Sequence, residues 1–95
     1  MLAMIRVNVI IKAKQTQRDS LIETINKLAS HTRLEEGCYA YELYENVIDE
    51  SALLIFESWE SEVYLGKHLQ TKHYKELMLL AHSMAEDWKV ERFEY

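Results

Sequence analysis

The sequence predicts an α+β fold with the element order strand–helix–strand–strand–helix–strand. Apolar residues recur at every second position in four segments, and two segments between them carry apolar residues at helical spacing. The length of 95 residues suits one domain, 1–95, and two glycines with no proline leave little material for long irregular loops. This order predicts a ferredoxin-like sandwich, in which the helices cover one face of a four-stranded antiparallel sheet.

The first strand and the first helix are the clearest elements. The strand is predicted over 3–12, where β-branched residues share one parity: Ile5, Val7, Val9 and Ile11. The helix is predicted over 17–34, with Thr16 as its N-cap and Gly37 as the stop beyond its end. Its core-facing stripe is formed by Leu21, Ile22, Ile25, Leu28, Ala29 and Thr32.

The remaining elements follow in order along the chain. Two strands over 38–47 and 52–60, joined by a polar turn, are predicted to form a hairpin. A second helical region begins after Ser61, a suitable N-cap, and a further cap at Thr71 predicts that the region is divided in two. The alternating segment over 88–95 is predicted to be the fourth strand.

Both faces of the predicted sheet carry apolar residues. Met4 and Ile10 lie on the parity opposite to the apolar run of strand one, and strand three has Leu54 and Phe56 opposite to Leu53 and Ile55. Because the helices can cover only one face, we predict a homodimer that packs sheet against sheet. The alternative is that long neighbouring side chains shade these mid-strand positions.

Composition excludes several classes of protein. The net charge of -5, with basic residues scattered among acidic ones, disfavours a nucleic-acid partner. Neither a signal peptide nor an apolar run of the roughly 20 residues in a membrane helix is present, so we predict a soluble cytoplasmic protein without a membrane partner. Cys38 alone forms no internal disulfide, and the four histidines lack metal-ligand spacing: His31 and His82 have no predicted partner, and His73 is expected at a rim.

Four segments, in order, resemble the antibiotic biosynthesis monooxygenase (ABM) domain: Glu-Glu-Gly-Cys at 35–38, Tyr-Glu-Leu-Tyr at 41–44, Glu-Ser-Trp-Glu-Ser at 57–61 and His-Leu-Gln-Thr-Lys-His at 68–73. The most specific feature is the Glu-x-Trp-x-Ser step with a histidine nine residues after the tryptophan. The resemblance, nearest to the small quinol monooxygenases, implies a dimeric α+β barrel with a cavity between sheet and helices in each subunit. It also implies oxidation of hydroxylated aromatics by O₂ with neither metal nor flavin.

Candidate site residues are chosen for their chemistry. His68 is the predicted catalytic base, since an imidazole titrates near neutrality, and Asn8 is the predicted orienting amide. Trp59 is predicted to form an aromatic wall of the substrate site, and Met78 is predicted to be a further substrate-binding residue. Each has a structural alternative: a buried histidine, an asparagine bonded to a nearby loop, or a tryptophan that fills the core.

Other polar and aromatic residues remain open between two roles. Tyr41 and Tyr44 are candidate substrate-binding residues, but their opposite parity allows only one to face the pocket. Glu57 lies between apolar residues and is expected to pair with Arg6 or Arg92. Haem breakdown is not expected: Asn8 matches haem-degrading relatives, but His68 stands where they have tryptophan.

The leading functional hypothesis is a monooxygenase that oxidises a quinol or polyphenol with O₂. The sequence contains no flavin or nucleotide motif, so the substrate is expected to supply the electrons. One alternative is an isomerase of a small, phosphorylated or free hydroxyketone, with Arg6, Arg33 or Lys67 available for a phosphate. The other alternative is a dimeric binding module without catalytic activity.

Overall fold

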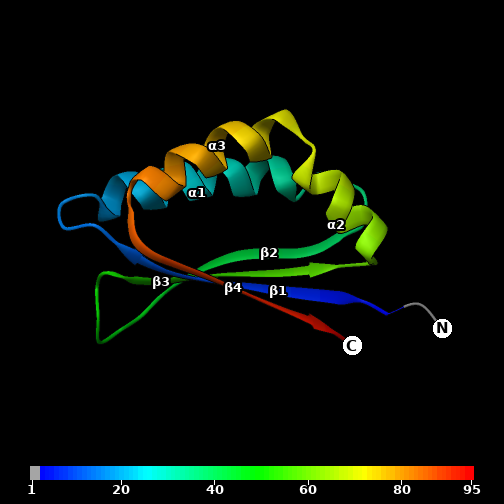
Figure 1. The fold of residues 1–95 in the computed structure, drawn as a ribbon, viewed down its shortest axis with the longest axis horizontal. Helices are drawn as coiled ribbons and strands as arrows, with labels where there is room; N and C mark the ends of the chain where they lie inside the picture. The colour runs from blue at the N-terminus through cyan, green and yellow to red at the C-terminus, as the bar shows by residue number, and fades with distance from the viewer. Residues whose placement is uncertain (1–2) are drawn as a thin grey trace.

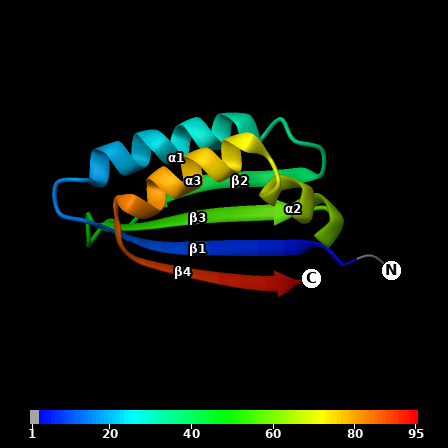
Figure 2. The ribbon, with the colours of Figure 1, turned by 45° about the horizontal axis from the view of Figure 1, so that its top comes forward.

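The computed structural model describes residues 3–95, and these form one sheet covered on one side by helices. The elements are β1 (Ile5–Ala13), α1 (Arg18–Thr32), β2 (Cys38–Glu45), β3 (Ala52–Trp59), α2 (Glu62–Leu69), α3 (Lys72–Ser83) and β4 (Ala85–Glu94). The antiparallel sheet has the order β2-β3-β1-β4, and all three helices lie on the same side of it (Figures 1 and 2). The predicted ferredoxin-like α+β fold is therefore confirmed.

β1 is a central strand, and its alternation divides the sheet into two faces. The parity of Val7 and Val9 is buried beneath the helices, whereas Asn8 and Ile10 are on the other side. We call these sides the helix-covered face and the open face. The core consists of β1 and β3 side chains of the helix-covered face packed against α1, α2 and α3.

The first helix is shorter than predicted at both ends. Thr16, the predicted N-cap, has a φ of 71° and lies in the turn before the helix, so its capping role was wrong. Gln17 takes the N-cap position, without a capping side-chain hydrogen bond within residues 3–95. The helix ends at Thr32, and residues 33–37 form turns that lead into β2.

Gly37 fixes the loop between α1 and β2 rather than the end of the helix. Its φ is +83°, and a Cβ at this position would lie 2.3 Å from the Tyr64 ring in α2. The Glu60 N–H donates to the Gly37 carbonyl at 2.8 Å. Loop 33–37 is therefore held against the end of β3 and the start of α2, which determines where Glu35 lies.

The second helical region is divided as predicted. The Thr71 side chain accepts a hydrogen bond from the Tyr74 N–H at 3.2 Å and so caps α3. Ser61 precedes α2 in an extended conformation but makes no such bond to the described residues. β4 begins at Ala85, three residues before the predicted start, because its pairing with β1 continues through a register shift near Ala13.

The open face retains large apolar side chains. Ile10 is 41% exposed, Phe93 48% and Tyr44 53%, while Leu54 and Phe56 are half-buried. Arg6 lies over the rings of Phe56 and Tyr95 on this face. Over residues 3–95, no helix has the length and apolar character needed to cross a membrane.

Candidate functional site

A cavity of about 240 Å³ lies on the helix-covered face, between α2, α3 and the β1–β4 side of the sheet. Its lining is mainly apolar, with a few convergent polar groups: Val7, Val9, Glu57, Leu65, His68, Leu69, Tyr74, Met78, Trp88, Val90 and Arg92. The combination of apolar walls and few polar groups is typical of small-molecule sites, although roughly 300–1,000 Å³ is the usual range for drug-sized ligands. The cavity suits a small ligand.

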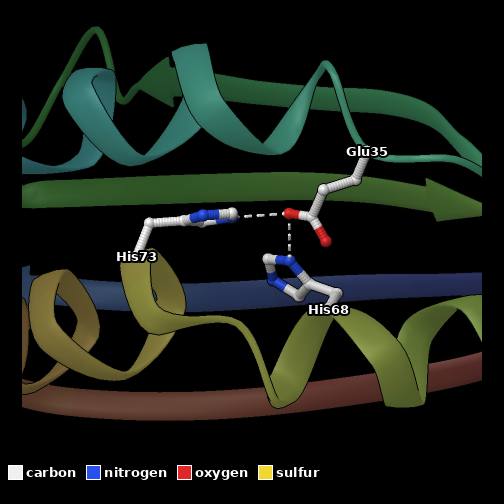
Figure 3. Close-up of side chains that lie close together, drawn as sticks. All are labelled: Glu35, His68 and His73. Atoms are coloured by element: carbon white, nitrogen blue, oxygen red, sulfur yellow. Dashed lines mark hydrogen bonds and ion pairs between the residues drawn. The ribbon is translucent and has the colours of Figure 1, made fainter.

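His68 is the central polar group of this site. Its side chain is 1% exposed, and Nδ1 lies 2.8 Å from the Glu35 carboxylate oxygen Oε2 (Figure 3). Nε2 is buried and has no hydrogen-bond partner among residues 3–95. A buried polar atom without a hydrogen-bond partner is uncommon, so a hydrogen-bond donor on a ligand would stabilise Nε2.

The surroundings of His68 keep its imidazole neutral. Burial lowers its pKa below the usual 6.5, and the nearby His73 acts in the same direction, whereas Glu35 opposes the shift by hydrogen bonding and charge. A carboxylate only accepts hydrogen bonds, so the hydrogen of the neutral ring is on Nδ1 and the lone pair is on Nε2. Such a ring can take a proton from a ligand.

Glu57 is a second titratable group of the cavity. It is buried, and its Oε1 accepts a hydrogen bond from the indole N–H of Trp59 at 3.0 Å. Burial raises the pKa of Glu57 to about 7, a shift that the Trp59 hydrogen bond opposes and the Glu35 charge reinforces. The carboxyl can therefore donate or accept a proton near neutral pH.

The predicted arginine partners of Glu57 were wrong. Arg6 has the opposite parity on β1 and lies on the open face, on the far side of the sheet from Glu57. Arg92 lines the cavity but is 2.8 Å from Glu62 of α2. The hydrogen-bond donor to Glu57 is instead Trp59, which lies two positions further along β3. Residues two apart in a strand lie on the same face of the sheet, so their side chains can meet.

The two tryptophans lie differently with respect to the cavity. Trp59 is fully buried behind the cavity, with its ring centroid 4.7 Å from that of His68, and it is not among the lining residues. Trp88 of β4 lines the cavity instead. Met78 lines the cavity from α3, whereas Tyr41 is fully buried beside His68 with a ring separation of 6.1 Å.

Asn8 and Tyr44 lie on the open face, separated from His68 by the sheet. They line a groove of about 420 Å³ together with Ile10 and Glu91, among others. The two residues predicted to be catalytic, His68 and Asn8, are therefore not brought together. The alternation of β1 already indicated this separation, because it places Asn8 on the face of the sheet opposite to that of Val7 and Val9.

Sequence reasoning missed several residues of the site: Glu35, Tyr74, Trp88, Val90 and Arg92. Trp88, Val90 and Arg92 share one parity in β4, and they face the cavity because they pair with Ile11, Val9 and Val7. This register depends on pairing between strands that are far apart in the sequence, and the alternation of β4 does not specify it.

Glu35 contacts two histidines, His68 and His73, and the sequence predicted an acidic partner for neither of them. Its Oε2 lies 2.8 Å from Nδ1 of His68 and 2.8 Å from Nε2 of His73 (Figure 3). The ring of His31 stacks on that of His73, with 5.2 Å between the ring centroids. His82 stacks on Trp88 at 3.9 Å, and both His31 and His82 are exposed, which agrees with the expectation of a structural or solvated role.

One carboxylate with two imidazoles is also a donor set that Zn²⁺ accepts in catalytic sites. The three ligand atoms of Glu35, His68 and His73 lie within 4.8 Å of one another, a grouping that their separation in the sequence concealed. Hydrogen bonds from both imidazoles to the shared Oε2 oxygen account for this close approach.

The single cysteine has the properties of a structural side chain. Cys38 is half-buried at the start of β2, and burial, with the charges of Glu35 and Glu57, raises its pKa to about 11. The thiolate, which is the reactive form, is therefore scarce at neutral pH.

Comparison with known proteins identifies the family. A protein of Bacillus subtilis (strain 168) named putative monooxygenase YcnE is 32% identical over 72 residues, 76% of this chain and 76% of that protein. The structure of a Bacteroides thetaiotaomicron VPI-5482 protein, described as a possible oxidoreductase, has a TM-score of 0.95, 30% identity and full coverage of both chains. Rv0793 of Mycobacterium tuberculosis shares the fold, with a TM-score of 0.88, 24% identity and coverage of 95% of this chain and 92% of its own. Since the family model described as antibiotic biosynthesis monooxygenase also matches residues 4–78, this chain belongs to that family.

Proposed function

We propose that this protein is a monooxygenase that oxidises a small hydroxylated aromatic compound, of the quinol type, with O₂. The observation that carries the proposal is the buried, unpartnered Nε2 of His68, a neutral base that belongs to the lining of the cavity. Membership of the family and the name of the Bacillus subtilis relative support the reaction class.

The first step is removal of a phenolic proton. A quinol hydroxyl placed at Nε2 of His68 satisfies that nitrogen and transfers its proton to it. Glu35, bonded to Nδ1, stabilises the imidazolium that forms. The resulting phenolate is electron-rich and can reduce O₂, so the substrate itself is the electron donor in this proposal.

The second step consumes O₂. A ring carbon of the phenolate forms a bond to one oxygen atom, which gives a peroxide at that carbon. Loss of the hydrogen on that ring carbon cleaves the O–O bond and leaves one oxygen atom on the ring as a carbonyl. The other oxygen atom leaves as water, with one proton returned by His68 and the second derived from the broken C–H bond. A benzenediol and O₂ thus give a hydroxyquinone and water, and the base is regenerated.

The cavity walls suit a flat aromatic ring. Met78 and Trp88 provide polarisable and aromatic surface, and Val7 and Val9 form its floor on the sheet. Apolar walls exclude water, which strengthens the interaction of the phenolate with nearby charges. Glu57, with a pKa of about 7, can donate a hydrogen bond to a second oxygen of the ring.

Oxygen consumption tests this proposal directly. Protein treated with chelator and free of visible absorbance is mixed with a panel of benzene- and naphthalenediols in an oxygen electrode. We expect enzyme-dependent uptake that His68→Gln loses and that Glu36→Gln, a change on the exposed loop surface, retains. Uptake that appears only after a metal or flavin is added, or that His68→Gln retains in full, would overturn the proposal.

The isomerase alternative has less support. A phosphorylated substrate needs an unpaired cation at the cavity. Arg92 is the arginine that lines the cavity, and it is bonded to Glu62. Of the other candidates, Arg6 lies on the open face and Arg33 is bonded to the Tyr41 carbonyl and to Glu42.

We also propose that a second copy of the chain covers the open face. Ile10, Tyr44 and Phe93 are about half exposed there, next to Leu54 and Phe56. A second copy related by a two-fold axis places the same apolar side chains opposite one another and removes both sets from water. Sedimentation at micromolar concentration is expected to give twice the chain mass, and a monomer would contradict this pairing.

A further inference from the structure

We infer that Glu35 is a positioning residue that fixes the tautomer and the ring orientation of His68, and that His73 holds the Glu35 carboxylate in place. This inference rests on the proposed function, in which His68 is the base. Glu35 is not part of the cavity lining, so it acts on a substrate only through the imidazole.

The geometry of the carboxylate is the first argument. A single oxygen, Oε2, lies 2.8 Å from both Nδ1 of His68 and Nε2 of His73. Because the carboxylate supplies only acceptors, each of these nitrogens must donate a hydrogen. For His68, which is neutral, this leaves Nε2 without a hydrogen.

The placement of Glu35 is the second argument. Its N–H donates to the Thr32 carbonyl at 3.0 Å, and its own carbonyl accepts from the Cys38 N–H at 3.2 Å. Gly37 attaches the same loop to β3. The main chain of Glu35 is therefore held on both sides by hydrogen bonds, and its side chain, only 15% exposed, is largely shielded from water.

His73 supplies the third argument. It projects from the first turn of α3, whose position depends on the Thr71 cap, and its ring stacks on His31 of α1. The carboxylate of Glu35 is thereby bonded from α2 and from α3 at once. This arrangement links the loop after α1 to both halves of the second helical region.

The chemistry explains why such support is needed. A free neutral histidine favours the tautomer with hydrogen on Nε2, and that tautomer would present a donor to the substrate hydroxyl and could not accept its proton there. A carboxylate that binds Nδ1–H reverses this preference, the role that the aspartate has in serine proteases. We therefore expect the loss of Glu35 to prevent His68 from acting as the base without preventing substrate from binding in the cavity.

Nitrogen NMR of the histidine side chains tests the inference without measuring activity. Selectively ¹⁵N-histidine-labelled protein, with chelator present, reports which ring nitrogen of His68 carries hydrogen. We expect hydrogen on Nδ1 in the wild type and a partial or complete shift to Nε2 in Glu35→Ala. Glu35→Gln keeps the size of the side chain but adds a donor, so it is also expected to populate the other tautomer. Glu36→Gln, with the same charge change on an exposed neighbour, is expected to match the wild type.

Kinetics provide the second measurement. Loss of an orienting carboxylate costs between about 10-fold for supporting residues and about 10⁴-fold in a serine-protease triad. For Glu35→Gln and Glu35→Ala we expect a fall in kcat within that range and an unchanged KM. His73→Ala is expected to lower kcat less, because the Glu35–His68 bond survives.

The pH profile separates positioning from packing. Glu35 raises the pKa of His68, so its removal is expected to move the acidic limb of the rate to lower pH. The titratable or charged groups that surround His68 or share its cavity are Glu35 in the loop, His73 and Tyr74 on α3, Tyr41 on β2, Glu57 on β3 and Arg92 on β4. A merely structural glutamate would leave this limb where it is.

Each result decides between the inferences. An unchanged His68 tautomer in both Glu35 variants overturns the positioning role, whatever their activity. A changed tautomer supports it, even if the wild type oxidises none of the diols, in which case the proposed function fails alone. If Glu35→Ala does not fold, the isosteric Glu35→Gln still gives the tautomer.

Discussion

The two faces of the sheet use the same strands for different purposes. On the helix-covered face, β1 contributes Val7 and Val9 to a closed core and to the floor of a small cavity. On the open face, the intervening residues Asn8 and Ile10 line a wide groove beside Tyr44. Alternation along one strand thus gives one chemistry to the interior and another to the exterior.

The two faces also differ in the surroundings of their polar groups. The helix-covered face buries Glu57 and His68, and burial raises the pKa of Glu57 and lowers the pKa of His68, so that each shift favours the uncharged form of the side chain. On the open face, the guanidinium of Arg6 rests on aromatic rings that remain partly exposed. These surroundings support the two proposals, proton transfer on the helix-covered face and contact with a second copy of the chain on the open face.

The largest expected effect is on the helix-covered face, at His68. His68→Gln can still bond to Glu35 but cannot take up a proton, so turnover of a quinol should fall about 10²–10⁴-fold. The loss of packing against Trp59 and Tyr74 should lower stability by no more than about 1–3 kcal/mol. Oxygen uptake and urea unfolding on the same preparation check both values. Normal turnover per folded molecule would place the base elsewhere.

A charge on the open face should act on association instead. Ile10→Glu introduces a carboxylate opposite its two-fold copy, and like charges at an interface cost several kcal/mol. We therefore expect the dissociation constant of the dimer to rise by about 10²-fold or more, as measured by sedimentation over a dilution series. Leu79→Glu, on an exposed α3 position, introduces the same charge and should leave the mass unchanged. Equal behaviour of the two variants would contradict pairing through the sheet.

Glu57, on the helix-covered face, should make the free energy of unfolding depend on pH. Its folded pKa of about 7 lies above the ordinary 4.5, so its contribution is fully present below pH 4.5 and is lost as pH rises to about 7. A shift of this size corresponds to about 3 kcal/mol. Glu57→Gln should therefore flatten the profile and be more stable than the wild type at pH 8. Urea unfolding at pH 5 and pH 8 measures the effect, with the open-face variant Glu91→Gln as a control that should keep the wild-type slope.

The smallest effect is expected at Asn8. Because the sheet separates this residue from His68, Asn8→Ala should change turnover by less than about twofold when the dimer is intact, since it removes no group from the cavity. Steady-state kinetics well above the dissociation constant measure this. A loss as large as that of His68→Gln would mean that the open face takes part in the chemistry.

The sequence by itself determined the order of elements and the division of the sheet into two faces. Period-two alternation in β1 and helical spacing in α1 report local geometry, which depends on residues close together in the chain. The cap at Thr71 was readable for the same reason, whereas Thr16 was not a cap because the turn before α1 required a positive φ at that residue.

Only the tertiary structure decided which side chains form the site. Glu35 and His68 are 33 positions apart in the sequence. They meet because Gly37 holds loop 33–37, which carries Glu35, against the end of β3, while α2, which carries His68, folds back over the sheet. Trp88 lines the cavity because β4 pairs with β1 in a register that places Trp88 beside Ile11. Sequence patterns specify the face on which a residue lies, but the contacts across elements depend on strand order and loop path, which are set by the packing of the whole chain.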